Sequence, residues 1–391
     1  MKRSLQGRFV KTSYAGEVVQ AFLPNPLPSM EDIQWTANLR TKFDKALVCL
    51  GRLDAISRIL PRPDLFIFTY IHKEALLSSI IEGTQSSLSE LILFEQDAYS
   101  TNIAKEFDDL TETSNYIKAF DHAIKRLTEG FPLSLRLICE IHEQLLASGR
   151  GSQKNPGEFR RSQNWIGGTR PGNAFFVPPP FKNVPELMGQ LEDFLHDKFF
   201  ETPILLKAAL AHVQFETIHP FLDGNGRLGR LLITLLLYND KILSQPILYL
   251  SLYFKLHRTR YYELLNIVRY EGDWEVWLDF FAEAVIYSSE QAVNDAHRLL
   301  TLFEQDRLKI SGLGRVSESV KLVFNTFEKF PIQIAKRVTN ITQLTPATVN
   351  KSLKELVHLN ILRQQGVHNR HRIYVYSKYM DILNEGTELN E

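Results

Sequence analysis

The feature that most constrains this chain is a run of twelve residues, 219–230, which reads His-Pro-Phe-Leu-Asp-Gly-Asn-Gly-Arg-Leu-Gly-Arg. Apolar residues recur at helical spacing both before the run, in residues 203–218, and after it, in a leucine-rich stretch. The Asp-Gly-Asn-Gly segment between them favours a turn and cannot comfortably continue either helix. The sequence therefore predicts a helix, a tight polar loop and a second, more apolar helix that is buried.

A loop of this kind is suited to binding an anion. Its glycines let backbone N–H groups converge, and the following helix adds unpaired amides and the positive end of its dipole. Arg227 and Arg230 share one face of the first helical turn, where they oppose the dipole unless an anion such as phosphate lies between them. Asp223 can hold a Mg²⁺ that bridges two phosphates, and His219 can take a proton from an attacking hydroxyl.

The run resembles the signature of the Fic family, His-Pro-Phe-x-Asp-Gly-Asn-Gly-Arg-x-x-Arg, with every fixed position filled. Members of that family transfer the AMP moiety of ATP to a hydroxyl of a target protein. The resemblance implies that His219 is the general base, that Asp223 is the Mg²⁺ ligand and that Phe221 packs inward. It also implies a set of residues that bind ATP and its phosphates: Gly224, Asn225, Gly226, Arg227, Leu228, Gly229 and Arg230, the last nearest the γ-phosphate. The alternative is a helical corner with a capping Asp and a core His.

An earlier helix, predicted over residues 65–81, ends in an unusual way at Glu82-Gly83. A carboxylate in the last turn opposes the helix dipole at a cost of roughly 0.3–1 kcal/mol unless a cation compensates. Taken alone, Glu82 is a solvated residue at a helix end. However, Ser78, Glu82 and Gly83 resemble the inhibitory motif that class II Fic proteins carry N-terminal to the catalytic core. There the glutamate pairs with the second motif arginine, here Arg230, and blocks the productive position of the γ-phosphate.

Residues 149–180 differ in character from the helical segments. The pattern predicts two short strands around a glycine-rich turn, formed by Arg160, Arg161, Trp165, Ile166, Gly167 and Gly168 together with residues 173–178. The alternatives are an ordinary surface hairpin and, by resemblance to Fic proteins, a flap that holds the target segment over the active site, with 165–168 nearest the nucleotide.

Three further side chains were weighed as site residues. Tyr261 and Tyr262 can stack on or hydrogen-bond an adenine, although such aromatics more often belong to the core. His142 lies between Glu140 and Glu143, but this spacing suits a zinc helix poorly, so we expect His142 to be structural or exposed.

Beyond a linker at 311–314 the composition changes. Residues 315–380 contain 11 Lys or Arg against 3 Asp or Glu, a net charge of +8, so the neutral chain carries −8 elsewhere. The pattern predicts helices over 318–330 and 332–338, a third that Thr345 caps and Pro346 begins, and strands at 361–363 and 372–376. This order resembles a winged helix–turn–helix module, which binds DNA through its third helix or serves in protein docking or dimerisation. The residues expected to face DNA are Thr348, Asn350, Lys351, Lys354, Arg370 and Arg372.

We therefore predict a mainly α protein in which a Fic-type helical core carries a small β-hairpin flap and is followed by the winged-helix-like domain. The expected boundaries are 1–105 for an N-terminal region with the inhibitory helix, 106–310 for the catalytic core and 315–380 for the C-terminal domain. Residues 1–30 are expected to be extended rather than helical.

Two cysteines are too few for a disulfide framework, and no apolar run is long enough to span a bilayer. We therefore expect a cytoplasmic protein with no membrane partner. By resemblance it is a protein adenylyltransferase that uses ATP and Mg²⁺ on a Tyr, Thr or Ser hydroxyl of a target protein, with the chain itself as a further target and as a dimer partner. The alternatives left open are removal of AMP at the same site and a DNA-binding regulator whose Fic core is a sensor.

Overall fold

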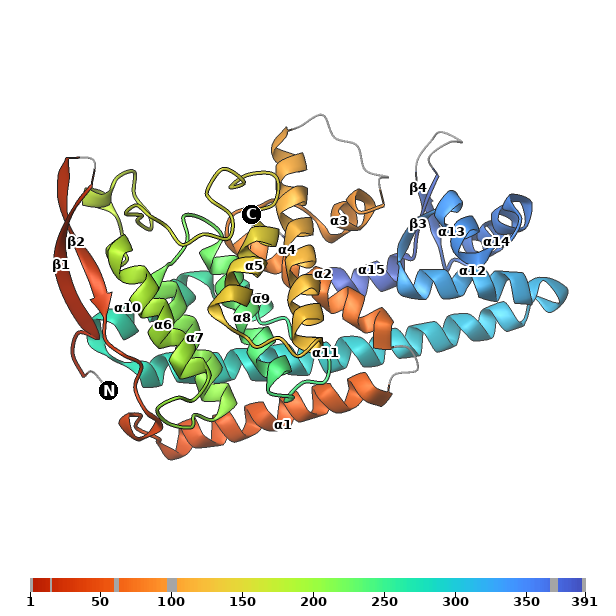
Figure 1. Ribbon diagram of the computed structural model, residues 1–391. Coiled ribbons are helices and arrows are strands. Elements are labelled where there is room, and N and C mark those ends of the chain that lie inside the picture. The colour runs from red at the N-terminus through yellow and green to blue at the C-terminus, as the bar shows by residue number, and fades with distance from the viewer. Residues whose placement is uncertain (1–2, 15, 60–62, 97–103, 366–371, 389–391) are drawn as a thin grey trace.

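The two helices predicted around the glycine-rich loop are α7 (Ile204–Ile218) and α8 (Asn225–Asn239). They pack against each other in the computed structural model (Figure 1), which describes residues 3–14, 16–59, 63–96, 104–365 and 372–388. Both helices are buried along nearly their whole length, and apolar side chains dominate that buried surface, although charged side chains such as Glu216 and Arg230 are buried with them. The helices that surround them are α2 (Pro63–Ile81), α4 (Ala104–Thr128), α5 (Leu135–Leu145), α6 (Val184–Leu195) and α10 (Arg258–Glu271).

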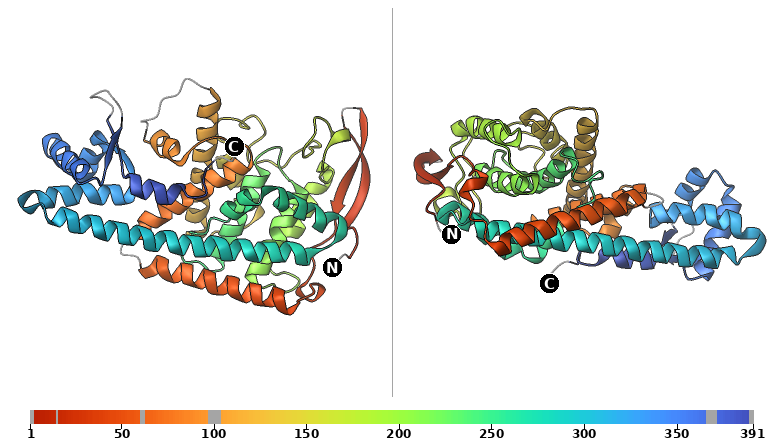
Figure 2. Two further views of the ribbon diagram at one scale, coloured as in Figure 1. Left: turned by 180° about the vertical axis from the view of Figure 1, so that it is seen from behind. Right: turned by 90° about the horizontal axis from the view of Figure 1, so that it is seen from below.

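Two long helices run along one side of this core. α1 (Ala37–Ile59) lies beside α11 (Trp274–Ser311), and α11 continues from the helices around α7 and α8 to the C-terminal module (Figures 1 and 2). The short helices α3 (Leu88–Phe94) and α9 (Ser251–Leu256) pack against α2. The mainly helical fold class predicted from the sequence is confirmed. Among the described residues, no helix combines the length and the apolar character that crossing a bilayer requires.

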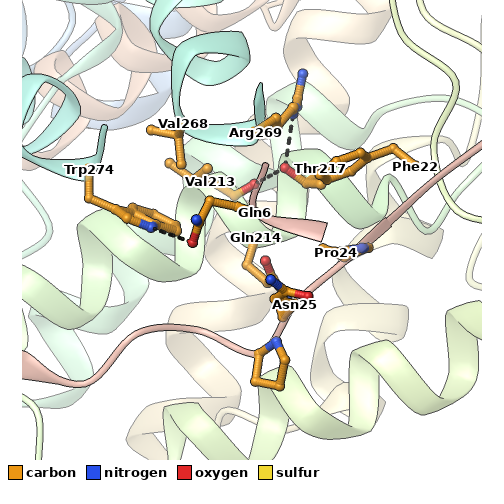
Figure 3. Close-up of a pocket in the computed structure, with 11 residues that line it drawn as sticks. Gln6, Phe22, Pro24, Asn25, Val213, Gln214, Thr217, Val268, Arg269 and Trp274 are labelled. Atoms are coloured by element: carbon orange, nitrogen blue, oxygen red, sulfur yellow. Dashed lines mark hydrogen bonds between the residues drawn. The ribbon is translucent and has the colours of Figure 1, made fainter. Parts of the chain in front are cut away.

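The N-terminal segment, predicted only as extended, forms a hairpin of β1 (Gly7–Tyr14) and β2 (Glu17–Pro24). It packs against the end of α7 that leads into the loop. Figure 3 shows the small pocket at this junction, where Trp274 Nε1 donates to Gln6 Oε1 (3.4 Å) and Arg269 Nε donates to Thr217 Oγ1 (3.0 Å). β2 therefore packs on the last turns of α7, the helix that leads into the loop.

The described residues of the C-terminal module form four helices and a three-stranded antiparallel sheet. Its elements are α12 (Ser317–Lys329), β3 (Ile332–Ile334), α13 (Ala335–Thr342), α14 (Pro346–His358), β4 (Arg363–Gln365), β5 (Ile373–Val375) and α15 (Ser377–Asn384), with sheet order β3-β5-β4. As predicted, the Thr345 side chain caps α14 by accepting a hydrogen bond from Thr348 N, and Pro346 begins the helix.

Two predictions for this module need correction. Residues 332–334 form a strand rather than the start of a helix, because the β-branched Ile332 is buried and pairs with Val375 of β5. The strand predicted at 361–363 begins two residues later, since Ile361 and Leu362 are buried in the core of the module. Arg370, expected to contact phosphates, lies outside the described residues.

Candidate active site

The loop between α7 and α8 is fixed by its own side chains. Asn225 closes it with two reciprocal hydrogen bonds, since its Oδ1 accepts from Phe221 N and its Nδ2 donates to Phe221 O, both at 2.9 Å. Phe221 is buried, as the resemblance implied. Asn225, predicted as part of the anion cradle, therefore uses its side chain to hold the loop.

His142 on α5 contacts this loop at Phe221 and Asp223. Its ring stacks on Phe221 with 3.7 Å between centroids, and its Nδ1 accepts from Gly157 N (2.9 Å). Nε2 then carries the proton and donates to Asp223 O (3.0 Å). Burial lowers the pKa of His142 to about 4, which keeps the ring neutral. His142 is therefore structural, which is one of the two outcomes expected for it.

The carbonyl end of α7 is held by a buried arginine. Arg160 Nε donates to His219 O (2.9 Å), and its Nη2 donates to Pro179 O (2.6 Å) and to Ile218 O. Asn164 Nδ2 adds a bond to Phe221 O (3.0 Å). The sequence pattern predicted Arg160 only as part of a short strand and gave Asn164 no role, because contacts to a distant segment leave no periodic signal.

His219 lies at the point where α7 ends, in a left-handed backbone conformation (φ 51°). Its side chain is 19% exposed, and its Nδ1 lies 4.0 Å from Glu216 Oε2. Burial, together with the nearby charges of Arg160 and Arg269, lowers the pKa of His219. The imidazole is therefore neutral at pH 7 and able to accept a proton.

Glu216 was not predicted as a site residue. Its carboxylate is buried and packs so closely on Gly229 that a Cβ at that position would overlap it. Burial raises the pKa of Glu216 to about 7, although the charges of Arg230 and Arg269 oppose the shift. One of its oxygens, Oε1, has no hydrogen-bond partner among the described residues.

The N-terminus of α8 has no side-chain cap. Gly224 is the N-cap in a left-handed conformation (φ 74°), which favours glycine, and no side chain caps the helix. The amides of the first turn are therefore not satisfied by the helix itself. Gly226 matters because a Cβ there would overlap the carboxylate of Glu82. Glu82 thus occupies the space over this turn where an anion would bind.

The two motif arginines point to different partners. Arg230 Nη2 donates to Glu82 Oε1 (2.7 Å) and to Ser78 O (2.9 Å), and its Nε donates to Ser78 Oγ (2.9 Å). Arg227 Nη1 instead lies 3.1 Å from Glu112 Oε2 on α4, and Arg150 also pairs with Glu112. The structure thus brings Ser78, Glu82 and Arg230 together. Gly83 takes no part in this contact and lies in the turn that follows α2.

Donors remain for a phosphate at both arginines. Arg230 Nη1 and Arg227 Nε are buried and have no hydrogen-bond partner among the described residues. Partial burial raises the pKa of Glu82, but the adjacent Arg230 outweighs it, so the pKa of Glu82 is lowered and the carboxylate is ionised. The Glu82 carboxylate is thus an anion that the Arg230 guanidinium holds through a charge-assisted hydrogen bond.

Asp223 fits the requirements of a Mg²⁺ ligand. Its side chain is 38% exposed, and its Oδ1 accepts from Gly224 N (2.6 Å). Its Oδ2 has no hydrogen-bond partner within the described chain. Mg²⁺ commonly takes one carboxylate and completes its shell with phosphate oxygens and water, so this single side chain suffices. The described residues hold no cluster of three or more His, Cys, Asp or Glu that could hold a metal without such ligands.

The remaining residues predicted to contact the nucleotide differ in how exposed they are. Tyr261 is fully buried and its hydroxyl bonds to His212 Nε2 (2.8 Å), so it is part of the core. Leu228 is likewise buried, and the Gly229 carbonyl faces His212. Tyr262 is partly exposed beside Arg258, whose guanidinium lies 5.2 Å from its ring centroid. Of the two tyrosines, only Tyr262 presents a ring surface that a base can reach.

The predicted flap is less regular than two strands. Its edges are joined by one isolated antiparallel bridge between Ile166 and Phe176, with Ile166 N donating to Phe176 O (2.9 Å). Pairing stops there because Gly167 and Gly168 both have positive φ and turn the chain away. Gly167 and Gly168 are exposed and Trp165 is half-buried, so the edge of this segment is accessible.

The loop residues of this site lie within a region that matches a known protein family. Residues 132–237 match the family model described as Fic/DOC family, and residues 40–125 match that of the Fic/DOC family N-terminal region. The chain is 33% identical over 223 residues to "Protein adenylyltransferase Fic" of Aedes aegypti, and 30% identical over 273 residues to the protein of that name from Drosophila grimshawi. These matches cover 54% and 66% of this chain but 40% and 52% of the relatives, so the chain spans about half of their length.

Two solved structures share the fold. A Fic family protein from Desulfovibrio desulfuricans G20 superposes with a TM-score of 0.57 at 19% identity, covering 88% of this chain and 97% of that one. A Fic domain containing signaling protein from Bacteroides thetaiotaomicron gives a TM-score of 0.51 at 20% identity, covering 67% and 97%.

Proposed function

Because the chain belongs to the Fic/DOC family, we propose that it is a protein adenylyltransferase, which transfers AMP from ATP to a Tyr, Thr or Ser hydroxyl of a target protein. The observation that carries this proposal is that a neutral His219 ends α7, while the helix that follows the loop, α8, begins without a side-chain cap and its Arg230 keeps a donor with no partner among the described residues. The relatives named protein adenylyltransferase support the same activity.

The reaction requires little covalent chemistry from the protein. The hydroxyl oxygen attacks the α-phosphorus of ATP, the bond from that phosphorus to the bridging oxygen breaks, and pyrophosphate leaves. His219 takes the proton of the hydroxyl. The first-turn amides of α8, Arg227 and Arg230 hold the phosphates and offset the developing charge, so catalysis rests on positioning and electrostatics. Asp223 would hold a Mg²⁺ that supplies further positive charge to the phosphates.

We further propose that Glu82 inhibits this reaction. Its carboxylate lies over Gly226 and pairs with Arg230, which is the guanidinium proposed to bind the terminal phosphate. Two anions cannot use the same guanidinium and the same space. The protein would therefore rest in a weakly active form until Glu82 moves away.

The target protein would bind along the flap. The edge at 165–168 offers backbone groups to an extended segment, and such strand addition sets register without regard to most side chains. Phe175 is 79% exposed next to this edge and offers an apolar contact. The acceptor hydroxyl would then lie over the loop beside His219.

The test is transfer of label from α-labelled ATP to protein. Glu82→Gly should raise the rate roughly 10- to 100-fold, because a charge-assisted hydrogen bond of about 1.5–3 kcal/mol no longer competes with the phosphate. His219→Ala in the same background should abolish labelling. Glu129→Gly is the matched control, since Glu129-Gly130 follows α4 as Glu82-Gly83 follows α2, but Glu129 pairs with Lys125 and Arg126 of its own helix and not with Arg230.

An unchanged rate in Glu82→Gly would contradict the inhibitory role, and labelling that survives His219→Ala would contradict the proposed base. Mass spectrometry of the labelled protein identifies the group transferred. Incubating a modified target with the wild-type chain then tests removal of AMP, in which Glu82 would position a water molecule.

A further inference from the structure

We propose that the C-terminal module binds duplex DNA through the outward face of α14. The inference does not depend on adenylyl transfer. α13 and α14 are joined by a turn of three residues, 343–345, in which Gln343 takes the left-handed conformation (φ 56°). α12 packs against both helices. Two helices joined by a short turn, with a third behind them, are the arrangement that presents the second helix to the major groove.

The outward face of α14 is a continuous polar stripe at helical spacing. Its exposed members are Ala347, Asn350, Lys351, Lys354 and His358, whereas Val349, Ser352, Leu353 and Leu356 face the core of the module. No hydrogen bond or ion pair joins the side chains of Asn350, Lys351 or Lys354 to another of the described residues. These groups are therefore free to contact a ligand.

The charge of the module is not cancelled at this face. Of the three acidic residues in 315–380, Glu328 is fully buried and paired with Arg307 (2.7 Å), and Glu318 is paired with Lys321 on α12 (3.4 Å). Only Glu355 borders the stripe, and it is half-buried. Lys336 on α13 and Arg363 on β4 add exposed positive charge. The complementary partner is a polyanion.

Among polyanions, the shape favours the DNA duplex. α14 has 13 residues and so is about 20 Å long, and the major groove admits a single helix. Asn350 is of the type that bonds adenine through two hydrogen bonds, and the lysines suit guanine or phosphate. A helix that docks on a protein would instead present aromatic or large apolar anchors. The large apolar side chains exposed in this module, Leu322 and Ile341, lie on α12 and α13.

The position of α14 leaves room for a duplex. The helix lies at the end of the molecule opposite the β1–β2 hairpin, and it packs against α12 and α13 (Figures 1 and 2). α7 and α8, which flank the active-site loop, lie apart from α14 in Figure 1. Binding at this face would therefore not obstruct the proposed active site.

The experiment titrates the full chain into a labelled duplex pool of random sequence at several salt concentrations, with binding followed by fluorescence anisotropy. We expect binding that weakens steeply with salt. Lys351→Ala with Lys354→Ala should weaken it and reduce the slope of log affinity against log salt by about 2, roughly one for each lost phosphate contact. The control removes Lys118 and Lys125 together, two exposed lysines on α4, and should leave both quantities unchanged.

Sequence selection from the same pool tests direct readout. Asn350→Ala should relax the preference at one base pair, with a loss of roughly tenfold in discrimination there. Thermal melting of each variant checks that it folds. The proposal is overturned if the full chain shows no salt-dependent binding to the duplex, or if the α4 control loses as much affinity as the α14 variant. In the first case α14 is a face for protein docking instead.

Discussion

At the scale of single residues, the arrangement around His219 suggests a role for Glu216 beyond packing. A base that has taken a proton becomes a cation, and a carboxylate beside its other nitrogen stabilises that cation and fixes the ring. Glu216 lies one helical turn before His219, with 4.0 Å between Oε2 and Nδ1. The groups that face it are Arg230, Arg269 and Glu82. Because burial raises the pKa of Glu216 to about 7, the fraction of Glu216 that is ionised changes with pH near neutrality.

We therefore expect Glu216→Gln to change the pH profile of the reaction. Burial raises the pKa of Glu216 to about 7 and the charge of Glu82 adds to the rise, so in a Glu82→Gly background the helpful negative charge appears at a somewhat lower pH than in wild type. In the Glu82→Gly protein, the rate of AMP transfer should therefore rise as the pH rises towards and past neutrality. Adding Glu216→Gln should lower that rate roughly tenfold and flatten its dependence on pH. Measurement of initial rates between pH 5.5 and 8.5, chosen to bracket the shifted pKa, checks this.

The control for that experiment is Glu186→Gln, an exposed carboxylate on α6. Calorimetric ATP affinity should stay the same in both variants, since Glu216 acts on the proton and not on the phosphates. A Glu216→Gln variant that keeps the shape of the parent's pH profile would show that Glu216 only fills space beside Gly229.

At the scale of elements, the sequence predicted the periodic parts well and the supporting contacts poorly. The apolar repeats located α7 and α8, and the Thr345-Pro346 pair located the start of α14, because these signals are local. Arg160 and Glu112 could not be found in this way. Each gains its role from a segment far along the chain, and a buried charge looks like any surface charge in a linear pattern.

The same limit applies to the sheet and the flap. β3 was expected as helix because three residues are too few to show an alternating pattern, and its strand partner lies about 40 residues later. The flap was expected as two strands because its aromatic and β-branched residues favour them, whereas consecutive glycines with positive φ override that preference.

The support that α5 gives the loop leads to a stability prediction. His142 has an ordinary pKa of 6.5 and a pKa of about 4 when folded, so the unfolded chain binds more protons between these values. The stability that its neutral ring contributes is present above about pH 6.5 and is lost as the pH falls towards 4. We expect the free energy of unfolding of wild type to fall relative to that of His142→Gln by up to about 1.4 kcal/mol per pH unit in that range.

Denaturant unfolding of both proteins at several pH values measures this difference. A comparison with the variant is needed because Glu74 and Glu216, whose pKa values burial raises to about 7, act in the opposite direction in both proteins. Glutamine keeps one donor and one acceptor for Asp223 O and Gly157 N. Parallel pH curves for the two proteins would mean that His142 is not protected from protonation in the folded state.

At the scale of the whole molecule, the C-terminal module contacts α2, the helix that directly precedes Glu82. Tyr379 on α15 shares a hydrogen bond with Thr69 on α2, with 2.9 Å between their oxygens, and Phe330 packs edge-on against Phe68. Thr69 precedes Ser78 on the same continuous helix, about 14 Å along its axis. A helix moves largely as one rigid piece, so this contact helps to set where Ser78 and Glu82 lie.

Weakening the contact should therefore raise basal adenylyl transfer, but only while Glu82 is present. Tyr379→Phe removes one buried hydrogen bond of about 1 kcal/mol, which allows at most a rise of roughly fivefold. Combined with Glu82→Gly it should add nothing, because the inhibitory anion is already gone, and the double-mutant cycle would show full coupling. Tyr376→Phe is the matched control, since its hydroxyl bonds to Asp306 of α11 (2.7 Å) and not to α2. Equal effects of the two tyrosine variants, or an additive effect in the double variant, would mean that the module supports the fold without influencing the active site.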